Sequence, residues 1–222
     1  MHYERAIPFA RARDALDAWC KITKEKIRIP SNCCPALLPF ASELVPVSAE
    51  TGLAPVPVQL YGYRQEFPGA KLEIDTLMTG LFGKPFADST IISFGYSKTI
   101  DIGGGGAILT QDKSLADDLA KFEFFPKVLC SPLESALGHV HRIIMEKKKQ
   151  YEEIEKEFAY WVRPPAGRPV ITWRFIAKDG EVSISRMARE RGYKVSHNYP
   201  PLPGVTDYGA IHWGNSVVNI WK

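Results

Sequence analysis

The sequence predicts an α/β protein with a largely parallel sheet. In the first 120 residues, short apolar strands alternate with amphipathic helical stretches, an order typical of layered α/β structures. These strands show little polar–apolar alternation, which favours burial on both faces. The chain has 222 residues, 45% of them hydrophobic and 24% charged, so it can bury a core without disulfides or a structural metal. This composition excludes a disordered or collagen-like protein.

The first helix is the clearest element, because Ala15, Leu16 and Trp19 recur at helical spacing. A second helical stretch is interrupted by Pro39, which cannot donate a backbone hydrogen bond. Helices are thus expected over residues 9–24 and 35–44 and from residue 114 onward. Strands are expected at residues 27–30, 45–52, 56–62, 72–78, 89–95 and 107–112.

The pattern changes after about residue 120. One long helix is expected over 131–162, with Lys–Glu pairs four residues apart on its solvated side. A strand at 171–177, a helix at 184–192 and a strand at 216–222 follow. We therefore expect a large domain at 1–120 and a small α+β domain at 121–222.

Net charge and cysteine content limit the classes of function that this chain can have. The 28 Lys and Arg residues exceed the 25 Asp and Glu residues by three, which does not indicate a nucleic-acid surface. The four cysteines include no CxxC pair, so no metal site is expected, and reduced thiols favour a cytoplasmic protein. No apolar run approaches the ~20 residues that cross a bilayer, so no membrane contact is expected.

The segment 89–112, STIISFGYSKTIDIGGGGAILTQD, carries the main functional signal. A phosphate-binding P-loop is excluded because Ser97 occupies the position of its second glycine. A dinucleotide fingerprint is excluded by Ile108, and a serine–lysine acylation pair by Gly95. What remains is Lys98 at the end of a strand, beside hydroxyls and backbone amides that could hold an anion. Such a lysine could form a Schiff base with pyridoxal phosphate, or it could be a solvated lysine in a flexible turn.

This segment resembles the region around the cofactor lysine in the DegT/DnrJ/EryC1/StrS family of sugar aminotransferases. Weaker similarities occur in RDAL (13–16), RIPSNCCPAL (28–37), VQLYG (58–62) and LESALG (133–138). The resemblance implies a fold type I pyridoxal-phosphate enzyme, with a three-layer large domain like that of aspartate aminotransferase and a small C-terminal domain. The matching residues are Ser93, Lys98, Gly105, Gly106, Ala107, Thr110 and Asp112.

The resemblance also implies roles for individual residues. Lys98 would bind the cofactor as a Schiff base, and Asp75 would keep the pyridine nitrogen protonated. Ser93 would bind the phosphate. The remaining candidate cofactor-binding residues are Arg13, Cys34 and Met78. From the residues alone, Asp75 could instead cap a helix, and Ser93, Arg13 and Cys34 could be structural.

The implied activity is transfer of an amino group from glutamate or glutamine to a nucleotide-linked keto sugar or to a similar carbonyl compound. A homodimer is implied, because the family builds its site at a subunit interface. The alternative is a non-catalytic member that keeps the fold and serves as a binding or scaffold protein. Met78 favours this alternative because the family usually has glutamine there, and so do the apparently missing segments of the short chain.

Overall fold

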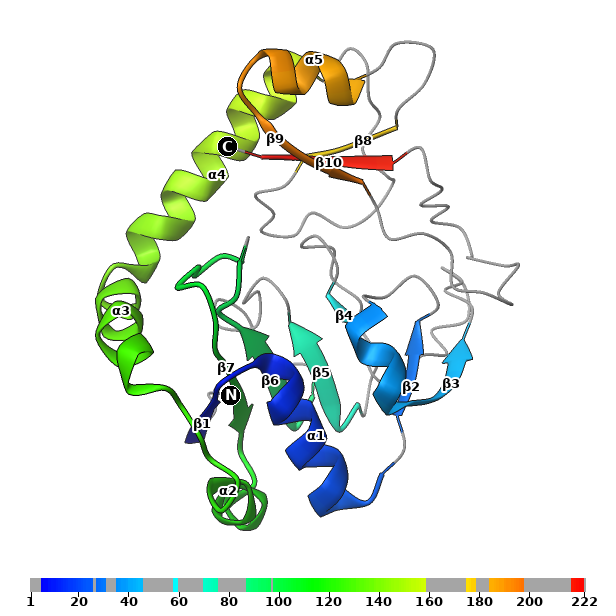
Figure 1. The fold of residues 1–222 in the computed structure, drawn as a ribbon, viewed down its shortest axis with the longest axis vertical. Helices are drawn as coiled ribbons and strands as arrows, with labels where there is room; N and C mark the ends of the chain where they lie inside the picture. Colours follow the sequence, from blue (N-terminus) through cyan, green and yellow to red (C-terminus); the bar gives the residue numbers. More distant parts are fainter. Residues whose placement is uncertain are drawn as a thin grey trace.

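The computed structural model describes residues 5–25, 27–30, 35–45, 58–59, 70–75, 87–96, 98–158, 175–178, 184–197 and 217–221. Figure 1 shows the five-stranded sheet below and a smaller, three-stranded sheet above. The helices are α1 (Ala12–Thr23), α2 (Lys113–Ala120), α3 (Lys127–Gly138), α4 (Val140–Phe158) and α5 (Ile184–Glu190), with a 3₁₀-helix η1 (Pro35–Phe40). The strands are β1 (Arg5–Phe9), β2 (Ile27–Pro30), β3 (Ala41–Val45), β4 (Val58–Gln59), β5 (Leu72–Asp75), β6 (Ser89–Ser93), β7 (Gly106–Thr110), β8 (Phe175–Lys178), β9 (Lys194–His197) and β10 (Val217–Trp221).

The large sheet has the order β1-β7-β6-β5-β4. Strands β4, β5 and β6 are parallel, whereas β7 is antiparallel to both β6 and β1. The expectation of a largely parallel sheet is therefore wrong for the half formed by β1, β7 and β6. No crossover helix separates β6 from β7, and adjacent strands joined in this way run antiparallel.

The large sheet has a hydrophobic cluster on each face. On one face, α1 and α2 pack against the strands, and Leu16 and Trp19 of α1 are buried with Ile108 of β7. Burial of each such side chain contributes about 1.5–3 kcal/mol. On the other face, Phe94 and Ile100 form a second cluster to which α3 contributes. The result is the predicted three-layer arrangement.

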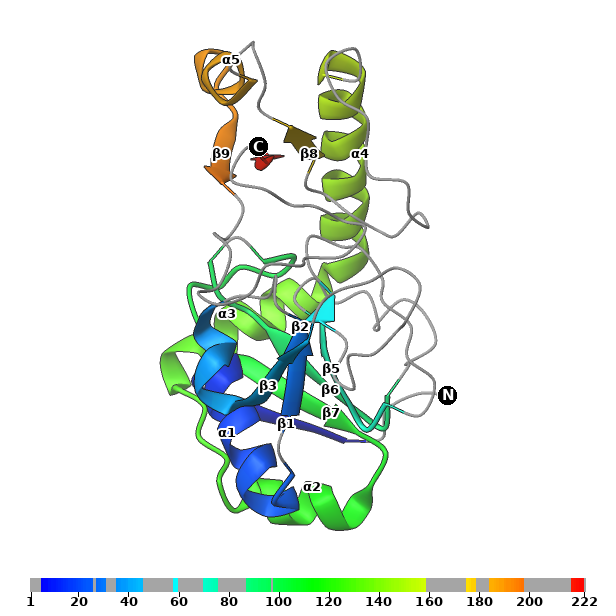
Figure 2. The same ribbon diagram turned by 90° about the vertical axis from the view of Figure 1, so that its right-hand side faces the viewer.

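The three-stranded sheet has the order β8-β10-β9, all antiparallel, and both α4 and α5 contact it. Ile154 and Phe158 of α4 are fully buried with Ala188 of α5. In Figures 1 and 2, α4 extends from the level of the large sheet to the small one. This helix links the two parts of the chain.

Two predicted helices are wrong in part. The stretch 35–44 forms only η1, after which β3 pairs in parallel with β2. Proline at both 35 and 39 prevents a regular α-helix there. The helix expected over 131–162 is two helices, which separate at Gly138 and His139, because glycine is a poor helix former.

Two strands, β1 and β9, were not expected from the sequence. Among the described helices, none is both long and apolar enough to span a bilayer.

Candidate active site

The candidate site lies at one edge of the large sheet. The parallel strands β5 and β6 both end at this edge, where Asp75 pairs with Ile92 and Ser93 follows. Strand β1 ends there as well, because Phe9 lies opposite Gly106 at the start of β7. Helix α1 begins three residues later. The topology therefore brings Asp75, Ser93 and the amino end of α1 to the same edge.

Ser93 lies directly beside the first turn of α1. It pairs with Gly106, where an added Cβ would lie 2.6 Å from both Cα and N of Ala12. Glycine is therefore required at 106 for the helix to approach the strand pair so closely. The half-buried Ser93 accepts a hydrogen bond at Oγ from the backbone N–H of Gly95, at 3.4 Å. Its hydroxyl is thus near a helix amino terminus.

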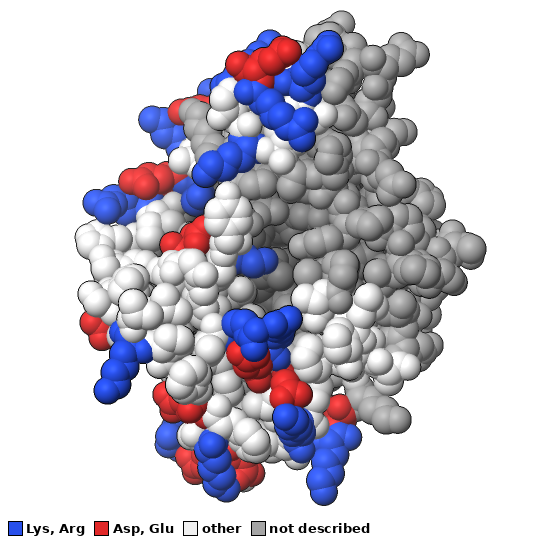
Figure 3. Space-filling view, viewed as in Figure 1, with Lys and Arg blue, Asp and Glu red and all other residues white. Residues whose placement is uncertain are grey.

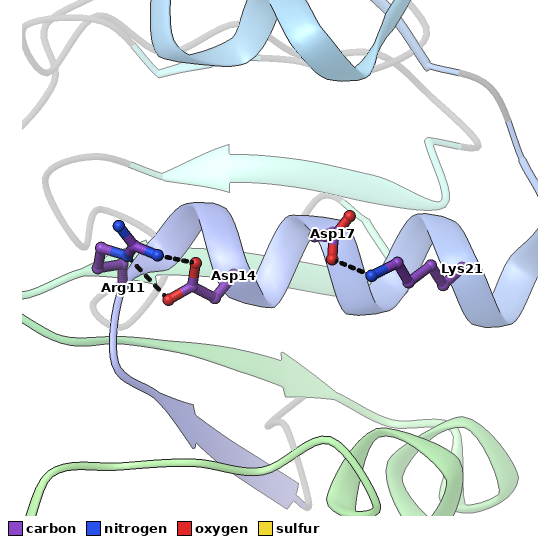
Figure 4. Close-up of polar contacts among 4 residues, drawn as sticks. All are labelled: Arg11, Asp14, Asp17 and Lys21. Carbon is purple, nitrogen blue, oxygen red and sulfur yellow. Dashed lines mark hydrogen bonds and ion pairs between the residues drawn. The ribbon is translucent and has the colours of Figure 1, made fainter.

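The first turn of α1 carries positive charge. Arg11 is the residue that precedes the helix, and no side chain caps the helix there. Its guanidinium instead donates two hydrogen bonds to Asp14, at 2.8 and 3.0 Å (Figure 4). The backbone of Arg11 pairs with Gly105. Asp14 neutralises this arginine, so it is the partial positive charge of the helix terminus that favours an anion at this edge.

Lys98 lies in the loop that joins β6 to β7. The loop is closed by hydrogen bonds from the N–H of Phe94 to the carbonyl of Gly105, at 3.0 Å, and from the N–H of Ile102 to the carbonyl of Phe94, at 3.1 Å. The N–H of Lys98 donates to the carbonyl of Gly95, at 3.2 Å. Lys98 itself is half-buried. The side chain of Lys98 is therefore partly removed from water.

Figure 3 shows a hollow near the middle of one face, with basic atoms visible inside it. Among the described residues in view, acidic side chains lie mainly above and below the hollow. This face therefore offers a recess that holds a positive group.

A buried carboxyl group, that of Glu73, lies two residues before Asp75 on strand β5. Glu73 is 1% exposed, and its Oε1 accepts a hydrogen bond from Oγ1 of Thr90, at 2.5 Å. Buried carboxyl groups require such partners because burial without them is costly. Within the described ranges, no cluster of three His, Cys, Asp or Glu side chains could hold a metal ion.

The structure brings together three of the predicted site residues. Lys98, Ser93 and the backbone of Asp75 all belong to the β5–β6 edge and its loop. Arg13 is exposed on the first turn of α1, near the same edge. The predictions for Cys34 and Met78 lie outside the described residues.

Two residues near the site were missed from the sequence. Arg11 was not singled out because the helix was expected to begin at residue 9, which placed Arg11 inside it instead of just before its start. Tyr96, two residues before Lys98, is 70% exposed. The sequence offered one signal for Tyr96, namely an aromatic residue inside the lysine motif itself.

No protein-family model matches the sequence, and no curated protein matches it. Solved structures do match it over almost its whole length. A DegT DnrJ EryC1 StrS aminotransferase from Brucella abortus has a TM-score of 0.74 at 15% identity, covering 98% of this chain and 80% of that one.

Two further solved structures agree with this result. Spr1654 of Streptococcus pneumoniae, described as a sugar aminotransferase and solved in its PMP form, has a TM-score of 0.74 at 13% identity, covering 98% of this chain and 81% of that one. DesI, solved in the presence of its TDP-sugar product, has a TM-score of 0.76 at 14% identity, covering 99% of this chain and 76% of that one. This protein therefore has the fold type I architecture of the solved DegT/DnrJ/EryC1/StrS sugar aminotransferases.

Proposed function

We propose that this protein is a pyridoxal-phosphate-dependent aminotransferase that acts on a keto sugar. The observation that carries the proposal is the gathering of Lys98, Ser93, Asp75 and the amino end of α1 at one sheet edge. An amine, an anion-binding corner and a carboxylate are the three groups that this cofactor requires. The solved structures with the same fold include PLP and PMP forms.

The residues present fit the cofactor. Ser93 Oγ and the first-turn N–H groups of α1 would bind its phosphate, with Arg13 adding positive charge. Asp75 at the end of β5 would hold a proton on the ring nitrogen. When bound, the cofactor supplies an aldehyde and an electron-withdrawing ring.

Lys98 would have two roles in catalysis. Its Nζ would attach the cofactor covalently and release it when an amino donor arrives. The freed amine would then remove a proton from Cα of the donor. Glutamate or glutamine is the proposed donor, and a nucleotide-linked keto sugar is the proposed acceptor. DesI, with its TDP-sugar product, supports this acceptor class.

The proposal is tested by loading the protein with pyridoxal phosphate, reducing it with borohydride and locating the modified lysine by mass spectrometry. We expect the label on Lys98 in the wild type and in Lys121→Ala, which removes an exposed lysine after α2. We expect no label at position 98 in Lys98→Ala, and no spectral change when glutamate is added to it. Labelling of a different lysine in the wild type would contradict the proposal. Labelling without any response to donors would favour the non-catalytic alternative.

We also propose that the protein is a cytoplasmic homodimer. Phe122, Phe124 and Val128 are 48%, 67% and 78% exposed, and Phe124 lies opposite Phe9 beside the β1 edge of the large sheet. Large exposed apolar side chains grouped in this way are typical of an interface. Light scattering should give a mass of twice 24.9 kDa. A mass of 24.9 kDa for the loaded protein at every concentration would contradict the dimer.

The division into domains at 1–120 and 121–222 remains part of this proposal. Separate hydrophobic clusters on the two sheets support it. Helix α3 packs against the large sheet, although it follows residue 120. The interface between the two units would therefore include α3.

A further inference from the structure

Tyr96 presents an aromatic ring to solvent beside the candidate catalytic lysine. Its side chain belongs to the loop between β6 and β7, and the residue is 70% exposed. Phe94 and Ile100 of the same loop are only 3% and 1% exposed. The loop therefore buries its other large apolar side chains and leaves this one outside.

Hydrogen bonds hold the backbone just before Tyr96. Gly95 donates to Oγ of Ser93 and accepts from the N–H of Lys98. The base of the loop is closed by the hydrogen bonds of Phe94 described above. These bonds restrain the residues that precede Tyr96 and so limit the entropy lost when a ligand covers its ring.

The position of Tyr96 identifies what could cover it. Consecutive Cα atoms are about 3.8 Å apart, so Cα of Tyr96 lies within about 7.6 Å of Cα of Lys98. The acceptor must bring its carbonyl carbon to the amino group delivered beside Lys98. The rest of the acceptor must then extend from Lys98 toward the solvent, and Tyr96 is the exposed aromatic residue nearest to Lys98 along the described sequence.

We propose that the Tyr96 ring is the platform on which the sugar ring of the acceptor packs. This inference rests on the proposed function. An aromatic face attracts the C–H groups on one side of a sugar ring, and the phenol hydroxyl can donate to a sugar oxygen. Tyr96 would thus contribute to acceptor binding and selectivity, not to the chemistry at Lys98.

The test uses the protein loaded with pyridoxal phosphate and two probes, TDP-glucose and TDP, measured by titration calorimetry. Wild type should bind TDP-glucose more tightly than TDP. Tyr96→Ala should weaken TDP-glucose binding about tenfold and leave TDP binding unchanged. Tyr96→Phe, which keeps the ring, should retain most of the affinity. Met145→Ala removes a side chain of similar exposure, 64%, from α4 and should change neither affinity.

The outcomes separate this inference from the proposed function. A change in the absorption spectrum of the wild type when glutamate is added tests the proposed function, and this test does not depend on any role of Tyr96. If that response occurs but Tyr96→Ala binds both probes as the wild type does, the platform is refuted and the aminotransferase stands. Equal binding of the two probes by the wild type also refutes the platform. If Tyr96→Ala changes the oligomeric mass, Tyr96 contacts a second copy of the chain and the inference is wrong. If the wild type does not respond to any donor, both proposals fail.

Discussion

Gly106→Ala should weaken both the fold and the cofactor site. An added Cβ at this position would lie 2.6 Å from Cα and N of Ala12 and 2.8 Å from the carbonyl oxygen of Ile92. Favourable contacts between such atoms are about 3.5–4.0 Å. The neighbours are backbone atoms, so the start of α1 or the strand pair must move by about 1 Å.

The loss of folding stability can be estimated from other substitutions that add atoms to a closely packed core. Such substitutions destabilise by about 1–3 kcal/mol, and the upper part of this range applies because no side chain can rotate away. The lower chain entropy of unfolded alanine offsets about 0.4–1 kcal/mol. The net loss is about 2 kcal/mol, which corresponds to a melting temperature lower by about 4–8 °C.

The matched control is Gly104→Ala in the same loop. There an added Cβ would meet only Cδ1 of Leu129, at 3.6 Å, an ordinary contact with a movable side chain. We expect a change within about 0.5 kcal/mol. Urea and thermal unfolding of the three proteins measure the difference. Equal stability of the two variants would refute the close approach of α1 to β7.

The same variant tests the anion-binding corner. If α1 moves, the phosphate of the cofactor loses its contacts, whereas the aldehyde does not. Gly106→Ala should therefore bind pyridoxal phosphate more weakly than the wild type but bind pyridoxal, which has no phosphate, about equally. An equal loss of affinity for both ligands would show that the substitution acts on a part of the site other than the phosphate contacts.

Three further predictions concern other parts of the chain. Phe158→Ala removes a fully buried ring that packs edge-on against Tyr193, at 5.7 Å between centroids, and should cost about 3–5 kcal/mol in urea unfolding, whereas Phe158→Leu should cost clearly less. Thr90→Val removes the hydroxyl that donates to buried Glu73 and should cost about 1–3 kcal/mol, whereas Thr90→Ser, which keeps the hydroxyl, should cost less; an equal or larger loss for Thr90→Ser would contradict the importance of this hydrogen bond. Burial raises the pKa of the Cys20 thiol to about 11 from 9.0, so the protonated thiol is favoured in the folded state. Its contribution to stability should be full below about pH 9 and lost as the pH rises toward about 11. The stability difference between wild type and Cys20→Ala should therefore shrink over that range, and parallel unfolding curves would contradict it.

The motif around Lys98 was predictable because it is contiguous. Ser93, Lys98 and Gly106 lie within 14 positions of each other, and two strands with a glycine-rich connection fix their order in space. Local sequence is enough to predict such a strand–loop–strand unit. The amphipathic pattern of Leu16 and Trp19 was equally sufficient for α1.

Strand β1 was not predictable in the same way. Pro8 interrupts it, and proline normally argues against a strand. The structure places β1 at the edge of the large sheet, where Pro8 lies opposite Ala107 and no second neighbour requires its missing N–H. Only the pairing of β1 with β7, about a hundred residues later, shows that this segment is a strand.

The sequence by itself determined the α/β class and located the strand–loop–strand segment that carries Lys98, whose chemical role stays a prediction. Tertiary structure decided that the start of α1 lies beside the β6–β7 pair, that Arg11 is the residue that precedes that helix, and that Tyr96 is exposed two residues before Lys98. The reason is physical. Propensity and periodicity act over a few residues, whereas the site forms where a strand from the start of the chain pairs with one that follows the lysine, and such long-range pairing depends on packing over the whole sheet.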